Sequence, residues 1–334
     1  QIQLPDIYRR EAGQLHTSSD GQKFDVVVDS LNANYSFKYH GHSKGASACS
    51  FIDERHLLFH SLVISSAEKE AAYVIDGLMH NDVVKSDIHS TDSHGYSEVV
   101  FGVLHPLGFS FAPRIKNLNK QQLHAFPEQK RRDYEEKGYS VLPDGYINVK
   151  LIEQHWDDIS RFVATIKLKR TTASQLFKRL NSYSKQNPLY KAIREFGKII
   201  KSIFILRYLD CVDLRQAVEK QLNKGESSNK FSKAVSFGNN HEFLQGEKTE
   251  QEIADSCRRL IKNSIVCWNY LYLSQRILNE TDEERRQDLI TSIRRGSVVA
   301  WKHITLHGEY DFSQEKLEDS VGLEVPKIRE LTVV

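Results

Sequence analysis

The spacing of the apolar residues changes along this chain of 334 residues, and the change limits the folds open to it. In the first 115 residues, apolar side chains form short runs between polar turn signals, which is typical of strands mixed with a few helices. From about Ile152 to Leu222 they recur with the period of a helix, and Thr249–Leu278 repeats that pattern. We therefore expect an α/β or α+β sheet layer that a mostly helical block interrupts or follows.

The first part of the chain predicts individual elements. Gln14–Ser19 is an extended run that we expect to end in a turn at Asp20-Gly21. The polar break at Asp53-Glu54-Arg55 predicts a hairpin. The other expected elements are the strands Phe24–Val28, Tyr35–His42, Ser47–Ile52, Leu57–Ser65, Val84–Asp92 and Phe109–Ile115, and the helices Ser66–Met79 and Gly95–Leu104, the latter stopped by Pro106.

The net charge of +2 hides an uneven distribution of charges. Between Ser160 and Leu209 there are twelve Lys and Arg residues and one acid, Glu195, so this segment carries +11 and the remainder of the chain −9. A solvated helical face usually explains a charge run, but here the alternating acids are missing. An anionic polymer partner, such as a nucleic acid, therefore stands beside that explanation.

Several function classes lack their motifs in this sequence. There is no G-x-x-x-x-G-K-[ST] and no G-x-G-x-x-G, so nothing supports an NTPase or a dinucleotide enzyme. The four cysteines are scattered, which argues against a disulfide framework and a thiolate zinc site. No apolar stretch approaches the roughly 18 residues that span a bilayer, so we expect a cytoplasmic protein without a membrane partner. Because the chain begins with Gln1 and its single Met is Met79, we expect a part of something longer.

Three acidic residues stand out by their positions. Asp20 and Asp92 follow strand-like runs, and Glu226 lies in Asn223–Ser227, where we expect a helix to begin. Two aspartates at strand ends and a glutamate on a helix supply the hard oxygen ligands that Mg²⁺ or Mn²⁺ prefers. Because the chain has 44 acidic residues, spacing alone leaves an exposed turn or a helix cap as the alternative for each of them.

Five blocks of residues carry a more specific signal. The longest, Ser90–Leu118, begins Ser-Thr-Asp-Ser-His-Gly-Tyr and ends Pro-Arg-Ile-Lys-Asn-Leu. The others are Leu15–Phe24 with Ser-Asp-Gly-Gln-Lys-Phe, Leu222–Glu226 with Asn-Lys-Gly-Glu, Ile265–Leu273 with Trp-Asn, and Val299–Ile304 with Ala-Trp-Lys-His. In this order, the blocks closely resemble the signatures of the replicative transposases of the Tn3 family. The resemblance covers about residues 7–315, and it implies the C-terminal catalytic region of a longer family protein.

The resemblance implies an RNase H-like α/β fold of the DDE transposase and retroviral-integrase superfamily, a mixed sheet flanked by helices. It divides the chain into the first part of the catalytic core (1–117), a basic, mostly helical insertion (118–215), the completion of the core (216–280) and a C-terminal tail (281–334). Carried over block by block, the catalytic and metal-binding DDE triad falls on Asp20, Asp92 and Glu226.

The same resemblance implies the chemistry. Two Mg²⁺ or Mn²⁺ ions on the triad would support hydrolysis at the transposon 3′ ends and transfer of the freed 3′-OH to target DNA. The outcome in the family is replicative transposition through a cointegrate. The implied partners are terminal inverted repeat DNA, target DNA and a second copy in a homodimer, with no nucleotide cofactor.

Seven cations are candidates for contacts with DNA phosphates. Lys44 lies where the family commonly has a glycine- and arginine-rich run, so it keeps the charge but loses the bidentate fork of arginine. The full set is Lys44, Arg114, Lys116, Lys167, Lys169, Arg170 and Lys224. Two alternatives share the fold: a catalytically inactive DNA-binding remnant, and a related RNase H-like nuclease without strand transfer.

Overall fold

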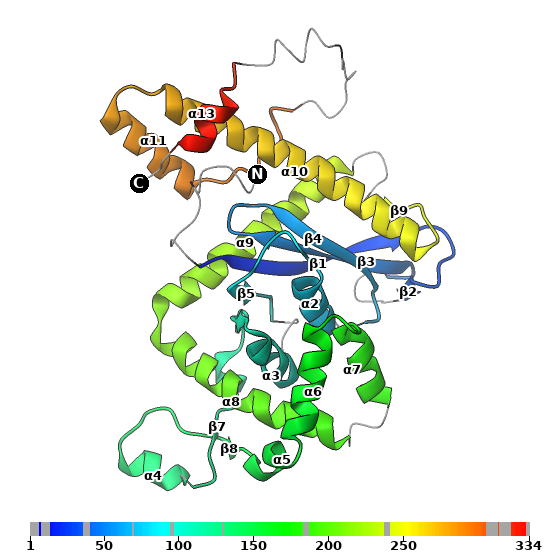
Figure 1. The fold of residues 1–334 in the computed structure, drawn as a ribbon, viewed down its shortest axis with the longest axis vertical. Helices are drawn as coiled ribbons and strands as arrows, with labels where there is room; N and C mark the ends of the chain where they lie inside the picture. The colour runs from blue at the N-terminus through cyan, green and yellow to red at the C-terminus, as the bar shows by residue number, and fades with distance from the viewer. Residues whose placement is uncertain are drawn as a thin grey trace. The chain divides into compact units, whose positions relative to one another are not determined.

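Strand β1 (His16–Val26) and helix α9 (Val212–Val235) each contribute residues to two units of the chain (Figure 1). Unit 1 comprises Gln1–Gly13, Gln22–Ala67 and Lys224–Val334, and unit 2 comprises Gln14–Gly21 and Glu68–Asn223. The computed structural model describes residues 7, 14–35, 41–68, 70–93, 97–128, 130–182, 187–236, 241–304, 313 and 322–331.

In unit 2, three parallel strands pair in the order β1-β5-β6. β5 (Ile88–Ser90) pairs with the first residues of β1, and β6 (Ser110–Phe111) pairs with β5. Helix α3 (Glu98–Leu107) makes the crossover that a parallel neighbour requires, and α2 (Glu70–Met79) precedes β5. The expected mixture of helices with a sheet is confirmed.

After β6, the described part of unit 2 is mostly helical. Its elements are η1 (Leu118–Lys120), β7 (His124–Ala125), α4 (Arg131–Glu136), β8 (Gly145–Tyr146), α5 (Val149–Gln154), α6 (Trp156–Lys167), α7 (Ala173–Ser182) and α8 (Pro188–Asp210). The long helix α8 begins where the Asn187 side chain accepts hydrogen bonds from the N–H groups of Leu189 and Tyr190, with Pro188 in the first turn. The helical period predicted over Ile152–Leu222 is thereby confirmed.

Helices α3 and α8 cross closely because each has a glycine at the crossing. A Cβ atom on Gly197 of α8 would lie 1.7 Å from the carbonyl oxygen of Glu98, and one on Gly102 of α3 would lie 2.6 Å from that of Ile193. Next to the crossing, Lys201 Nζ donates to Glu98 Oε1 at 2.8 Å. The two backbones therefore leave no space for a side chain at these glycines.

Unit 1 contains an antiparallel hairpin and a long helix. β3 (Lys44–Asp53) pairs with β2 (Asn34–Tyr35) and with β4 (Leu58–Ser65), and β9 (Glu242–Phe243) pairs in parallel with the end of β1. Helix α10 (Lys248–Asn279) packs on β4, and α11 (Glu283–Arg295) and α13 (Val325–Glu330) follow. The expected hairpin and the expected helix over Thr249–Leu278 are both confirmed.

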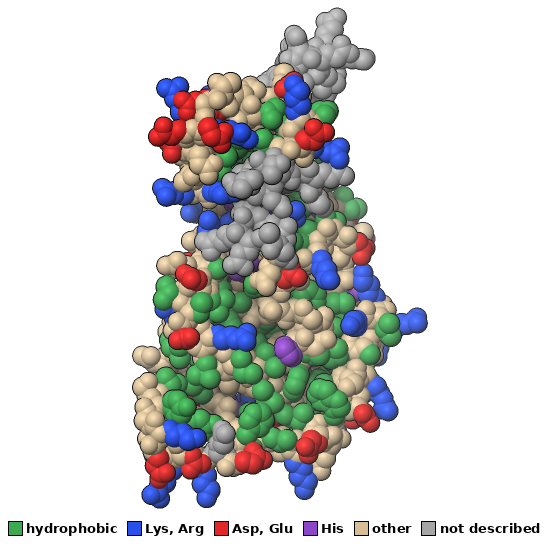
Figure 2. Space-filling view, turned by 60° about the vertical axis from the view of Figure 1, so that its left-hand side comes forward, with side chains coloured by type: hydrophobic (Ala, Val, Ile, Leu, Met, Phe, Trp, Pro, Cys, Tyr) green, Lys and Arg blue, Asp and Glu red, His purple; other side chains and the backbone are tan. Residues whose placement is uncertain are grey.

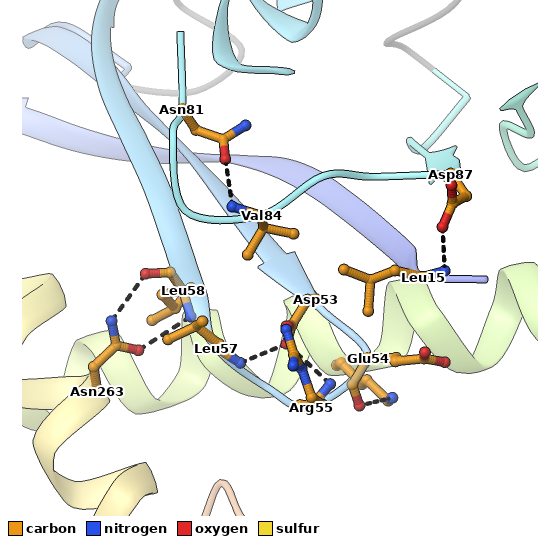
Figure 3. Close-up of polar contacts among 11 residues, drawn as sticks. Leu15, Asp53, Glu54, Arg55, Leu57, Leu58, Asn81, Val84, Asp87 and Asn263 are labelled. Carbon is orange, nitrogen blue, oxygen red and sulfur yellow. Dashed lines mark hydrogen bonds and ion pairs between the residues drawn. The ribbon is translucent and has the colours of Figure 1, made fainter. Parts of the chain in front are cut away.

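The turn between β3 and β4 is buried although its residues are polar. Asp53 accepts hydrogen bonds from the N–H groups of Arg55 and Leu57, each 2.9 Å long, and pairs with the Arg55 guanidinium at 2.7 Å (Figure 3). Burial raises the pKa of Asp53, although Arg55 and the N–H donors partly oppose this effect. Asn263 of α10 donates to the carbonyl of Leu58 and accepts from its N–H, which attaches the hairpin to the helix.

Hydrophobic side chains gather in the lower half of the face drawn in Figure 2, at the level of α4, α5 and α8. In this region, a groove of about 430 Å³ lies between the β7–β8 segment and α8. Among its lining residues, Phe126, Tyr139, Ile203 and Leu206 are exposed large hydrophobic residues. Within the described residues, no helix combines the length and the hydropathy that crossing a bilayer requires.

Three local predictions are wrong. The chain does not turn at Asp20-Gly21, because β1 runs without interruption from His16 to Val26. Pro106 lies inside the last turn of α3, and the helix ends instead at Gly108, whose φ of 94° glycine adopts readily. Glu226 lies within α9 and not at a helix start. Residues 36–40 of the expected strand Tyr35–His42, and 95–96 of the expected helix, are outside the described residues.

The crossing of α3 and α8 predicts a sensitive position in unit 2. Gly197→Ala should lower the free energy of unfolding by about 3 kcal/mol, the upper end for overpacking, because the atom it meets is a backbone oxygen. Urea unfolding followed by circular dichroism measures this change. Gly296→Ala is the matched control, because its new Cβ would meet nothing closer than 3.4 Å. Equal stability of the two variants would contradict the close crossing.

Candidate active site

The pairing of β1 with β5 sets the positions of the first two candidate carboxylates, both in unit 2. His16 lies opposite Ile88 and Ser18 opposite Ser90. Continuing this parallel register by two residues sets Asp20 across from Asp92. Asp20 is on β1, Asp92 follows β5 by two residues, and both are half-buried. The expectation that Asp92 follows a strand is confirmed.

A buried histidine of β5 contacts the same strand, β1. His89 has no exposed surface, and its two ring nitrogens are hydrogen-bonded to the hydroxyl groups of Thr17, at 2.8 Å, and Ser19, at 3.0 Å. Burial, with a smaller effect of the nearby His16, lowers the pKa of His89 to about 3. The ring is therefore neutral at ordinary pH, and it joins β1 to β5 through two hydroxyl groups of β1.

A second set of hydrogen bonds links the same strands to β6. His16 Nε2 lies 2.8 Å from the hydroxyl of Ser90, and Ser90 donates to the carbonyl of Ala112 at 2.7 Å. Beside them, the backbone N–H of Arg114 donates to the carbonyl of Thr91 at 2.9 Å. Arg114 therefore lies next to the segment that carries Asp92.

Helix α9 carries the third candidate. Glu226 is exposed, and it lies in the part of α9 that belongs to unit 1. In the same unit, Gln22 donates to the carbonyl of Asn229 at 3.0 Å. In unit 2, Gln221 Nε2 donates to the hydroxyl of Ser18 at 3.2 Å. Along β1, Asp20 thus lies between Ser18, which contacts α9 within unit 2, and Gln22, which contacts α9 within unit 1.

The two aspartates have the chemistry of a divalent-ion site. Carboxylate oxygens are acceptors only, and they are the ligands that Mg²⁺ and Mn²⁺ prefer. Asp20 and Asp92, each two residues beyond the paired Ser18 and Ser90, are of this residue type. Within the described residues, no three Asp, Glu, His or Cys side chains form a ready cluster for a metal ion.

The candidate phosphate-binding cations differ in their surroundings. Lys167, Lys169 and Arg170 are all exposed near the end of α6, and Lys116 is exposed too. Four of the seven cations have protein partners: Lys44 pairs with Asp29 at 3.4 Å, Arg114 with Glu219 at 3.4 Å and Lys169 with Asp82 at 3.0 Å, while Lys224 Nζ donates to the carbonyl of Glu54 at 2.5 Å. The partners of Lys44, Arg114 and Lys169 are exposed carboxylates, so these ion pairs contribute little and can exchange.

The sequence did not predict the structural contacts of several residues in unit 1. Asn269 donates to the carbonyls of Val298 and Ala300, at 2.8 and 2.7 Å, and its side-chain oxygen lies 2.8 Å from His303 Nε2. Trp301 stacks on Phe231 of α9, with ring centroids 4.9 Å apart. The only sequence signals for these contacts were the Trp-Asn and Ala-Trp-Lys-His blocks.

A family model described as the Tn3 transposase DDE domain matches residues 1–310. The chain belongs to this family. The transposase for transposon Tn1546 of Enterococcus faecium is 34% identical over 303 residues, covering 90% of this chain and 30% of that protein. The transposase for transposon Tn501 of Pseudomonas aeruginosa is 33% identical over 313 residues, covering 91% and 30%. The chain thus spans about 30% of the length of these relatives.

Membership of the Tn3 transposase DDE domain family confirms the resemblance of the five blocks. The transposase for transposon Tn21 of Escherichia coli agrees, with 32% identity over 88% of this chain. Within the family fold described above, the Ser-Asp-Gly and Ser-Thr-Asp blocks lie on and after the paired strands β1 and β5. The two blocks that carry Asp20 and Asp92 are thus in neighbouring strands of unit 2.

The neutral His89 predicts an acid-sensitive contribution to stability. Between pH 6.5 and about 3, the unfolded chain binds a proton on this histidine and the folded chain does not, so stability is lost as the pH falls through this range. From pH 7 to pH 5, His89 alone should account for a loss of about 2 kcal/mol. His89→Gln should flatten that part of the dependence in urea unfolding measured at both pH values. Equal losses in the variant and the wild type would contradict the buried neutral ring.

Proposed function

We propose that this chain is the catalytic region of a DNA transposase, which hydrolyses DNA at transposon 3′ ends and transfers those ends to target DNA. The observation that carries the proposal is the register of β1 and β5, in which Asp20 and Asp92 each lie two residues beyond the pair Ser18–Ser90, in a member of the Tn3 transposase DDE domain family. The names of the relatives, all transposases, support it. Replicative transposition through a cointegrate is the form of the reaction we infer.

The proposal includes an RNase H-like core. In support, β1, β5 and β6 form a parallel sheet with a helical crossover, and β3 and β4 form an antiparallel hairpin. The division into a first core part (1–117), a helical insertion (118–215), a second core part (216–280) and a tail (281–334) is part of the same proposal. The run of helices from α5 to α8 lies within the proposed insertion.

Asp20, Asp92 and Glu226 would hold the divalent ions, two Mg²⁺ or Mn²⁺, through their carboxylate oxygens. Such ions activate water or a 3′-OH as the nucleophile and stabilise the leaving oxygen of an in-line displacement. The contribution of the protein is positional. His89, Thr17 and Ser19 hold the two strands in register, and the two aspartates would then face the same phosphodiester.

DNA contacts would come from cations before, within and after the proposed insertion. Arg114 and Lys116 follow the strand next to Asp92, and they would contact the scissile phosphate. Lys167, Lys169 and Arg170 would contact the backbone farther away, while Lys44 and Lys224 complete the set. We infer that the substrates are terminal inverted repeat DNA and target DNA, and that a homodimer acts in the cytoplasm of a bacterium.

Asp92→Asn tests the proposed chemistry. The amide keeps the shape of the side chain but loses a charged oxygen ligand, so Mg²⁺-dependent nicking of a duplex with a transposon end should fall by about 1000-fold or more. Mn²⁺ binding to the purified chain, measured by calorimetry, should weaken as well. Asp157→Asn is the matched control, because Asp157 is an exposed aspartate of unit 2 in the first turn of α6. Equal nicking by the wild type and Asp92→Asn would refute the assignment of the triad. Hydrolysis by the wild type without strand transfer would favour the alternative, a related nuclease.

The proposed backbone contacts predict a change in salt dependence. Replacing Lys167, Lys169 and Arg170 together by Gln should reduce the slope of log affinity against log salt by about 2–3, since each lost phosphate contact removes about 0.9. DNA affinity at several salt concentrations, measured by fluorescence anisotropy, gives this slope. The control replaces Arg131 and Arg132 of α4, which pair with Glu135 and Glu136 on the same helix. A slope unchanged in the triple variant would show that these cations face only solvent.

A further inference from the structure

Asp20 shares one face of β1 with two residues that contact α9. Side chains of a strand alternate between its two faces, so Ser18, Asp20 and Gln22 lie on the same face of the uninterrupted β1. The hydrogen bonds of β1 agree with this alternation, because the residues on either side of Ser18 contact His89 instead. Both neighbours of Asp20 on its own face contact α9.

The contact before Asp20 lies within unit 2, and we call it the first tether. The Gln221 amide donates to the hydroxyl of Ser18 at 3.2 Å, and this hydroxyl donates to the carbonyl of Gln221 at 3.3 Å. Both residues are buried. Breaking this reciprocal pair would leave buried polar groups unsatisfied, so it attaches the first half of α9 to β1.

The contact after Asp20 lies within unit 1, and we call it the second tether. The Gln22 amide donates to the carbonyl of Asn229 at 3.0 Å. A carbonyl oxygen has two lone pairs, so it can accept this bond without losing its bond within the helix. α9 accordingly continues without a break to Val235.

Helix α10 holds α9 next to the second tether. Lys262 Nζ donates to the hydroxyl of Ser232 at 2.6 Å and lies 3.5 Å from that of Ser228. All three residues are buried. Because β1 and α10 both form hydrogen bonds with this stretch of α9, a rotation of the helix would break several of them at once.

The two tethers have matching separations along the strand and along the helix. Their strand residues are four positions apart, which is about 13 Å at the rise of a strand. Their helix residues are eight positions apart, which is about 12 Å at the rise of a helix. The midpoint of the first interval is Asp20, and that of the second is Gly225, the neighbour of Glu226. The tethers therefore bracket Asp20 on the strand and the segment that carries Glu226 on the helix.

We propose that Gln22 and Gln221 are positioning residues, which set the place of Glu226 along the face of β1 that carries Asp20. This inference rests on the proposed function, in which Glu226 is the third carboxylate. Glu226 is exposed, so burial of its own side chain does not fix it. Residues that orient metal ligands in this way affect metal binding although they do not touch the ion.

The first experiment measures hydrogen exchange of α9 in the metal-free chain. Gln22→Met keeps the length of the side chain but removes the donor, so the amides around Asn229 should exchange about 5-fold faster, the effect of one hydrogen bond. Gln121→Met is the matched control, because Gln121 is equally half-buried and its amide also donates to a backbone carbonyl, that of Asn117 at 3.3 Å. It should leave α9 unchanged. Equal exchange of α9 in Gln22→Met and the wild type would overturn the second tether.

The second experiment measures Mn²⁺ binding to the purified chain by calorimetry in a double-mutant cycle. Gln22→Met should weaken binding about 10-fold, and it should weaken it no further in a chain that already carries Glu226→Gln, because it acts through that carboxylate. Gln221→Met should behave in the same way, whereas Gln121→Met should bind like the wild type. A merely structural role of Gln22 would give the same loss in both backgrounds.

The results separate this inference from the proposed function. Equal Mn²⁺ binding and equal nicking by the wild type and Asp92→Asn would refute the proposed function, and the inference with it. If Asp92→Asn loses both, the proposed function stands. In that case, wild-type Mn²⁺ binding by Gln22→Met, or an equal loss with and without Glu226→Gln, would overturn the positioning role alone.

Discussion

The register between β1 and β5 is the constraint on which the candidate active site depends. A slip of one residue would turn Asp20 to the other face of the strand and away from Asp92. The buried ring of His89 opposes such a slip, because its nitrogens would lose the hydroxyl groups of Thr17 and Ser19. The contacts that stabilise the strand pair are thus the same ones that position the segments carrying the two proposed catalytic aspartates.

The sequence predicted those parts of the fold that local patterns determine. The β3–β4 hairpin, the long helix α10 and the position of Asp92 after a strand follow from periodicity and turn residues. The turn predicted at Asp20-Gly21 does not form, because β1 is paired at both ends. It pairs with β5 near His16 and with β9 near Val26, and this pairing outweighs a local turn preference. α9 likewise continues through the buried Gly225, where the sequence predicted a helix start. Spacing alone could not select three carboxylates among 44, so the triad came from the family resemblance.

Two of the family blocks have a structural explanation in unit 1. Asn269 of the Trp-Asn block satisfies two carbonyls in the segment that leads to Trp301, and Trp301 stacks on Phe231. Phe231 lies on α9, in the same unit as Glu226. These blocks fix the helix that carries the proposed third carboxylate, so a signature residue in this family need not touch substrate to matter for its chemistry.

Helix α10 shows why a helical period does not reveal which side of a helix is buried. Hydropathy would place Ile253 and Leu260 inside, yet in the first half of the helix the inner side carries Asp255, Arg258 and Lys262, and only the second half buries apolar residues such as Val266. These charges are tolerated because Arg258 lies over two aromatic rings, and because hydroxyl groups and Asp255 keep the Lys262 ammonium favourable even though burial lowers its pKa to about 8. Such an inner side costs more to build than an apolar one.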